Sequence, residues 1–211
     1  ARVWQLIRER AIQGQPSLLV VPEQFASTAD LTGYLRLGDS LHTYLKVCSF
    51  RTLTGMIEDR FGGGALRSIS DAGRMVLTRR ALAGLGDGIV YFHRSRRSAK
   101  FCADCAETLQ QLKYCGVSPE LLETAAGEAD GGRARRLNEL AAIYRAYEQA
   151  REATGLEPVD RISRAAERVQ NSFFEGLACF VDGFGEFTAP EAALLRRMLA
   201  AAPTVTVTLT C

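Results

Sequence analysis

An aspartate stands directly after an apolar run in the last quarter of the sequence. Residues 177–181 are all apolar, and Asp182 follows them. A strand that helices cover on both faces is continuously apolar rather than alternating, so this run predicts a buried strand of a parallel sheet. Ligands of open parallel sheets bind beyond the carboxyl ends of the strands. The pattern therefore places Asp182 where a carboxylate could do chemistry.

The residues after Asp182 predict a turn and then a helix. Gly183 and Gly185 permit a sharp turn. Thr188, Pro190 and Glu191 provide an N-cap hydroxyl, a proline in the first turn and an acid at the capping-box position.

Asp182 has two interpretations. It could hold the magnesium ion of a bound nucleotide, as a Walker B aspartate does. A hydrolysing motor usually carries a second acid directly afterwards, and Gly183 has no side chain that could serve. In the other interpretation Asp182 caps the turn after a core strand.

Composition sets broad limits on the class of protein. The chain has 211 residues, of which 47% are apolar, so it can bury a substantial core and is not disordered. Lysine and arginine number 26 against 24 acidic residues, so the net charge of +2 identifies no partner. No apolar run approaches the roughly 18 to 20 residues of a membrane helix, and the start does not resemble a signal peptide. We expect a cytoplasmic protein without membrane contact.

The cysteines suggest one metal hypothesis. Cys102 and Cys105, with His93 and Cys115, could supply zinc ligands. However, residues 99–114 have helical spacing, and no glycine supports a tight knuckle between the two cysteines. We interpret them as small core residues, in keeping with reduced cysteines in strand-like runs such as Cys48 and Cys179, and expect no metal site.

Apolar runs and turn signals predict an α/β fold with a parallel sheet. Strands are expected at 17–21, 45–49, 177–182 and 204–210. Between the second and third strands the strand signal disappears, which predicts an all-helical subdomain inserted into the sheet domain. The expected organisation is 1–67 and 171–211 for the sheet domain and 68–170 for the insertion.

The insertion carries two features with alternative meanings. A helix predicted over 135–154 has an aromatic stripe that includes Tyr144 and Tyr147, which suits a core better than a base-stacking platform. Basic runs at 93–97 and 133–136 could contact phosphates or could simply be solvated.

Four motifs together resemble a known family. They are Val20-Val-Pro-Glu-Gln-Phe25, Val47-Cys-Ser-Phe50, Leu112-Lys-Tyr-Cys-Gly-Val-Ser-Pro119, and Phe180-Val-Asp-Gly-Phe184 with Phe187 and Thr188. Their order resembles the AddB-type subunit of bacterial ATP-dependent helicase/deoxyribonucleases over nearly the whole chain. The resemblance implies a sheet of the P-loop NTPase/helicase type, from the superfamily 1-like N-terminal region of that subunit. It also implies a heterodimer with a helicase/nuclease partner subunit that resects DNA double-strand breaks for recombinational repair.

The resemblance also implies roles for individual positions. Pro22-Glu-Gln24 is similar to a helicase motif that touches the DNA backbone, and Asp182 is similar to the aspartate of the nucleotide site. Gly183 departs from the usual Asp-Glu pair, which favours a non-motor module whose partner drives translocation. The phosphate-binding loop GxxxxGK[ST] does not occur in this chain, and we expect it upstream, in a longer polypeptide. The alternative is an ATP-hydrolysing motor domain with its loop upstream. We expect no catalytic residue and no cofactor in this chain alone; the parent protein could use ATP and magnesium.

The carboxyl ends of parallel strands share one edge, so the polar residues after the predicted strands should form a common rim for phosphate contacts. The residues predicted to bind DNA at this rim are Glu23, Gln24, Ser49 and Arg51, beside Asp182. Arg94, Arg96 and Arg97 are predicted to add an electrostatic contribution.

Overall fold

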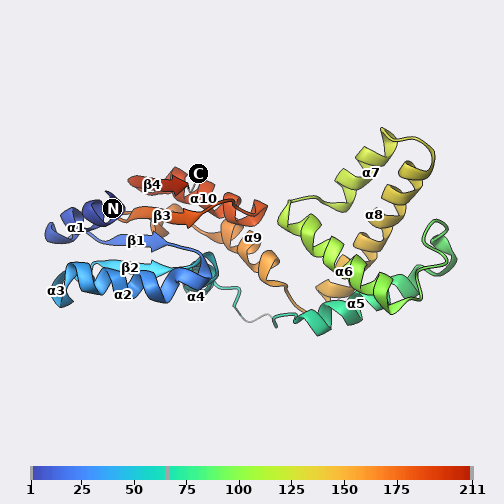
Figure 1. Cartoon of the computed structure of the whole chain (residues 1–211), viewed down its shortest axis with the longest axis horizontal. Coiled ribbons are helices and arrows are strands. Elements are labelled where there is room, and N and C mark those ends of the chain that lie inside the picture. Colours follow the sequence, from blue (N-terminus) through green and yellow to red (C-terminus); the bar gives the residue numbers. More distant parts are fainter. Residues whose placement is uncertain (1, 65–66, 210–211) are drawn as a thin grey trace. The chain divides into compact units, whose positions relative to one another are not determined.

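Four parallel strands form the sheet of this computed structural model, which describes residues 2–64 and 67–209 (Figure 1). Their order is β2–β1–β3–β4, and their bounds are Ser17–Val20 for β1, Leu45–Cys48 for β2, Ala178–Phe184 for β3 and Thr204–Leu209 for β4. In the central register, Val20 lies opposite Cys48 on one side and Val181 on the other. The predicted parallel α/β fold is confirmed. Position 210 of the last predicted strand lies outside the described residues.

Helices cover both faces of the sheet. Their bounds are Arg2–Ile12 for α1, Ala26–Leu37 for α2, Asp39–His42 for α3, Phe50–Phe61 for α4, Pro158–Arg168 for α9 and Ala189–Ala201 for α10, with 3-10 turns η1 at Glu23–Phe25 and η3 at Asn171–Phe173. Leu19 and Val21 of the first strand segment pack in a core with α1, whereas Leu18 and Val20 pack in a second core with α4 and α10. All four residues of β1 and the first four of β3 are therefore buried, because helices cover both faces of these central strands.

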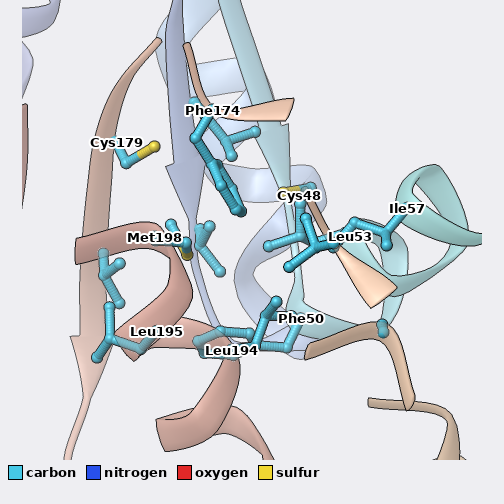
Figure 2. Packing of buried hydrophobic residues seen from close by; sticks show 14 of the residues in the cluster. Cys48, Phe50, Leu53, Ile57, Phe174, Cys179, Leu194, Leu195 and Met198 are labelled. Carbon is cyan, nitrogen blue, oxygen red and sulfur yellow. The ribbon is translucent and has the colours of Figure 1, made fainter. Parts of the chain in front are cut away.

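The second core is the larger of the two. Figure 2 shows the side chains of α4, α10 and Phe174 pointing into it. Leu53, Phe174, Leu194 and Met198 are at most 1% exposed there. The capping box predicted for α10 is present, since Thr188 accepts from the backbone N–H of Glu191 and the Glu191 carboxylate accepts from the backbone N–H of Thr188.

Among the described residues, 67–160 form a separate helical unit, and 2–64 with 161–209 form the sheet unit. The helical unit contains α5 (Asp71–Gly84), the 3-10 turn η2 (Gly86–Gly88), α6 (Ala99–Tyr114), α7 (Pro119–Gly127) and α8 (Gly131–Glu152). The boundaries expected from the sequence were 68 and 170. Residues 161–170 belong to the sheet unit because Ala165 and Ala166 pack in its core and Arg161 pairs with the Glu58 carboxylate of α4.

The aromatic stripe of α8 lies in the core of the helical unit. Tyr144 is 5% exposed and Tyr147 is fully buried. The core interpretation is therefore confirmed, since rings buried in this way offer no platform to a base.

Buried ion pairs hold the helical unit together. Lys113 Nζ lies 2.5 Å from Glu157 Oε2 and 2.6 Å from Glu148 Oε1, and Arg74 Nε lies 2.6 Å from Glu157 Oε1. Burial by itself would raise the pKa of Glu157, but the charge of Lys113 and hydrogen bonds from Lys113 and Arg74 outweigh it and hold the pKa below its ordinary value. Removing one partner would leave a buried charge uncompensated.

Candidate functional site

The ends of β1 and β2 are joined by a hydrogen bond between side chains. Ser49 is the N-cap of α4: its hydroxyl accepts from the backbone N–H of Thr52 at 3.2 Å and donates to the carboxylate of Glu23. Ser49 is only 3% exposed. The pair therefore fixes the beginning of α4 against the end of β1, with the Ser49 hydroxyl buried and Glu23 exposed.

Gln24 and Arg51 are exposed polar residues of the same region, beside the exposed Glu23. Gln24 lies in η1, directly after β1, and Arg51 lies in the first turn of α4, directly after β2. Neither side chain makes a hydrogen bond or an ion pair with another part of the described chain. Both are therefore available to an external ligand, beside the positive end of the α4 dipole.

Asp182 lies within β3 rather than after it. The strand continues to Phe184, with a shift of register against β4 between Val181 and Phe184. At this irregularity the Asp182 carboxylate accepts a hydrogen bond from the hydroxyl of Thr208 in β4. The predicted end of the strand at 182 is thus two residues early, and the carboxylate has a structural partner that sequence reasoning missed.

Gly183 brings the end of β3 against the end of β1. Its φ of +82° lies in the left-handed region, and a Cβ atom built there would be 3.5 Å from Pro22 Cδ. Residues with side chains rarely adopt this conformation. The position that carries a second acid in nucleotide-hydrolysing helicases is therefore held here in a conformation that favours glycine.

An aromatic cluster packs against the turn that follows β3. The rings of Phe184 and Phe187 stack with centroids 5.0 Å apart, and Phe50 meets Phe184 edge to face at 5.4 Å. The signal for this cluster was present in the sequence, because these phenylalanines each stand at or shortly after a strand end.

The structure thus brings residues from three strand ends to one edge of the sheet. We call Glu23, Gln24, Ser49, Arg51 and Asp182 the carboxyl rim. Glu23 meets Ser49 directly, and Gly183, the neighbour of Asp182, approaches Pro22, the neighbour of Glu23. The three arginines predicted to assist lie in the helical unit, where Arg94 and Arg97 are exposed and Arg96 pairs with Asp87 at 3.2 Å.

The proposed zinc ligands do not form a cluster. Cys102 and Cys105 are each 5% exposed in the core side of α6, and Cys102 Sγ donates to the carbonyl of Met75. In residues 2–64 and 67–209, no group of three or more His, Cys, Asp or Glu side chains is arranged to hold a metal ion. No helix in this part of the chain is both long and apolar enough to cross a membrane.

Fold and site together define an open parallel α/β domain with a helical insertion and a polar carboxyl rim. The chain belongs to the family described as "ADDB, N-terminal", whose model matches residues 2–211. Its relatives include AddB-type proteins, each named as a subunit of an ATP-dependent helicase/deoxyribonuclease. The protein from Desulforamulus reducens is 30% identical over 216 residues, and the one from Clostridioides difficile is 25% identical over 198 residues. The alignments cover 96% and 92% of this chain but 18% and 17% of those relatives. The resemblance seen in the sequence is therefore confirmed, and the chain corresponds to less than a fifth of the length of such a subunit.

Proposed function

We propose that this chain is a non-motor, helicase-like module of a DNA double-strand-break resection complex. The proposal is supported by membership of the family and by the name of the relatives, which describes one subunit of an ATP-dependent helicase and nuclease. In this proposal the chain works as part of a longer AddB-type subunit in a heterodimer with a motor and nuclease partner, in recombinational repair in the cytoplasm.

The carboxyl rim is the proposed contact with DNA. Gln24 and Arg51 are exposed and have no partner in the described chain, so they can donate hydrogen bonds to phosphate oxygens beside the first turn of α4. Ser49 is buried and positions that turn through its hydrogen bond to the Glu23 carboxylate. Contacts of this kind hold a strand without reading its bases. The arginines of the helical unit are not required for this contact.

The conformation of Gly183 is the observation that carries the non-motor assignment. A second acid at this position would have to adopt a φ of about +82°, which costs a residue with a side chain roughly 1–2 kcal/mol. In this proposal Asp182, with one oxygen engaged by Thr208, joins β3 to β4 rather than holding a magnesium ion. ATP and magnesium therefore belong, in this proposal, to the partner motor subunit.

Loss of the two free rim side chains tests the proposal. In the intact heterodimer, Gln24→Ala with Arg51→Ala should weaken DNA binding equally for all sequences. It should also reduce the slope of log affinity against log salt by about one. The matched control is Arg8→Ala with Gln15→Ala, which removes the same groups from exposed positions in α1 and at the amino end of β1.

Two results would contradict the proposal. Unchanged affinity in the rim variant, or an equal loss in the control, would remove the rim as the DNA contact. DNA-stimulated ATP hydrolysis by the isolated AddB-type subunit that disappears in Asp182→Ala would favour the motor domain instead.

A further inference from the structure

A groove of about 650 Å³ opens in the helical unit between α5 and the beginning of α6. Three arginines line it: Arg79 on α5, and Arg96 and Arg97 in the segment that leads to Ser98, the N-cap of α6. None of the lining residues, all of which the structure describes, is acidic or aromatic. The groove therefore has a strongly positive wall.

The floor of the groove is apolar. Met75, Val76 and Leu82 of α5 line it, and Val76 is 67% exposed although it lies in the middle of a helix. Val76 and the half-buried Met75 thus give the groove an accessible apolar surface beside its arginines.

The charges of the groove are incompletely paired. Arg79 and Arg97 are exposed and form no ion pair within the described residues, whereas Arg96 Nη2 lies 3.2 Å from Oδ1 of the fully exposed Asp87. The first turn of α6 contains no acid, so the positive end of its dipole is not neutralised by its own sequence. Asp87 shows that a carboxylate is accommodated at this wall.

We propose that this groove binds an acidic peptide segment of a protein partner, with carboxylates on Arg79 and Arg97 and apolar side chains on Met75 and Val76. Guanidinium groups match carboxylates in geometry and charge. Single-stranded nucleic acid fits less well, because its sites add aromatic side chains on which bases stack, and this groove has none. The proposal is independent of DNA binding at the carboxyl rim and gives the insertion a role in recruiting proteins.

The test uses the full chain and two fluorescent probes. One probe is a fluorescein-labelled peptide of alternating aspartate and leucine, and the other is fluorescein-labelled oligothymidylate. Fluorescence anisotropy should show that Arg79→Ala with Arg97→Ala weakens peptide binding by about tenfold, the effect of losing two exposed ion pairs. Val76→Asp should weaken it as well. The matched control, Arg80→Ala with Arg94→Ala, removes two exposed arginines that do not line the groove and should leave the affinity unchanged.

Three outcomes would overturn the proposal. The peptide could fail to bind the unaltered chain. Both double variants could lose affinity equally, which would mean unspecific attraction between charges. Finally, oligothymidylate could bind more tightly than the peptide and lose affinity only in the groove variant, which would make the groove a nucleic-acid site. All substituted side chains are exposed, so circular dichroism spectra of the variants should match that of the unaltered chain.

Discussion

Replacing Gly183 by alanine should destabilise the sheet unit by about 1 kcal/mol. The left-handed conformation costs a residue with a Cβ roughly 1–2 kcal/mol. Alanine also lowers the conformational entropy of the unfolded chain, which offsets about 0.4–1 kcal/mol of this cost. The new methyl group would lie 3.5 Å from Pro22 Cδ, an ordinary van der Waals contact, so no steric clash adds to the cost. The net effect is therefore a measurable but modest loss.

Urea denaturation followed by tryptophan fluorescence reports the unfolding of the sheet unit, which contains Gly183. Trp4 is the single tryptophan of the sequence and packs against the core that lies under α1. For slopes of about 1–3 kcal/mol per molar urea, a loss of about 1 kcal/mol lowers the midpoint by roughly 0.3–1 M.

The control is Gly55→Ala in α4 of the same unit. Gly55 does not have a positive φ, and a Cβ there would meet no atom within 4 Å. Alanine should therefore stabilise this helix by about 0.5–1 kcal/mol. If Gly183→Ala stabilises the unit as Gly55→Ala does, the left-handed conformation is not a constraint on this position. The structural argument against a second acid would then fail.

Four further predictions concern polar side chains and thiols elsewhere in the described chain. A double-mutant cycle with Asp182→Ala and Thr208→Val should show a coupling of about 1 kcal/mol in the same urea assay; additive losses would mean that the hydrogen bond does not form. Lys113→Met should destabilise the helical unit by about 3–5 kcal/mol, because Glu157 keeps Arg74 but the buried network loses one of its positive charges; circular dichroism melts should show this loss, and a neutral result would contradict the buried network. The pKa of Glu157 is lower in the folded protein than its ordinary value of 4.5. The stability that this carboxylate contributes should therefore be present above pH 4.5 and be lost as the pH falls through the lowered pKa. The melting temperature of Glu157→Gln should depend less on pH in that range than that of the unaltered chain. Among the thiols of the described residues, exposed Cys115 should react fastest with a thiol reagent, because burial raises the pKa of Cys48 to about 12; equal rates would refute this.

The secondary-structure elements and much of their burial could be predicted from local patterns in the chain. Its apolar runs predicted the parallel strands because a strand covered on both faces cannot alternate. Thr188 and Glu191 marked the beginning of α10, since a capping box satisfies backbone groups of its own helix and depends on nothing distant. The spacing of Tyr144 and Tyr147 likewise marked a core face, because helical periodicity is a local property.

Which polar groups meet could not be predicted in this way, because their partners lie far away in the sequence. The partner of Asp182 is 26 residues away in β4, and the partner of Ser49 is 26 residues earlier in η1. Whether residues 161–170 belong to the insertion or to the sheet depended on which core Ala165 and Ala166 enter. Periodicity predicts that one face of an element is apolar, but it does not predict which other element packs on that face. Likewise, the identity of a charged residue does not show whether it forms an ion pair within the protein. Both are settled when distant segments pack together. In the carboxyl rim, packing leaves Gln24 and Arg51 without a partner in the described chain and pairs Ser49 with Glu23.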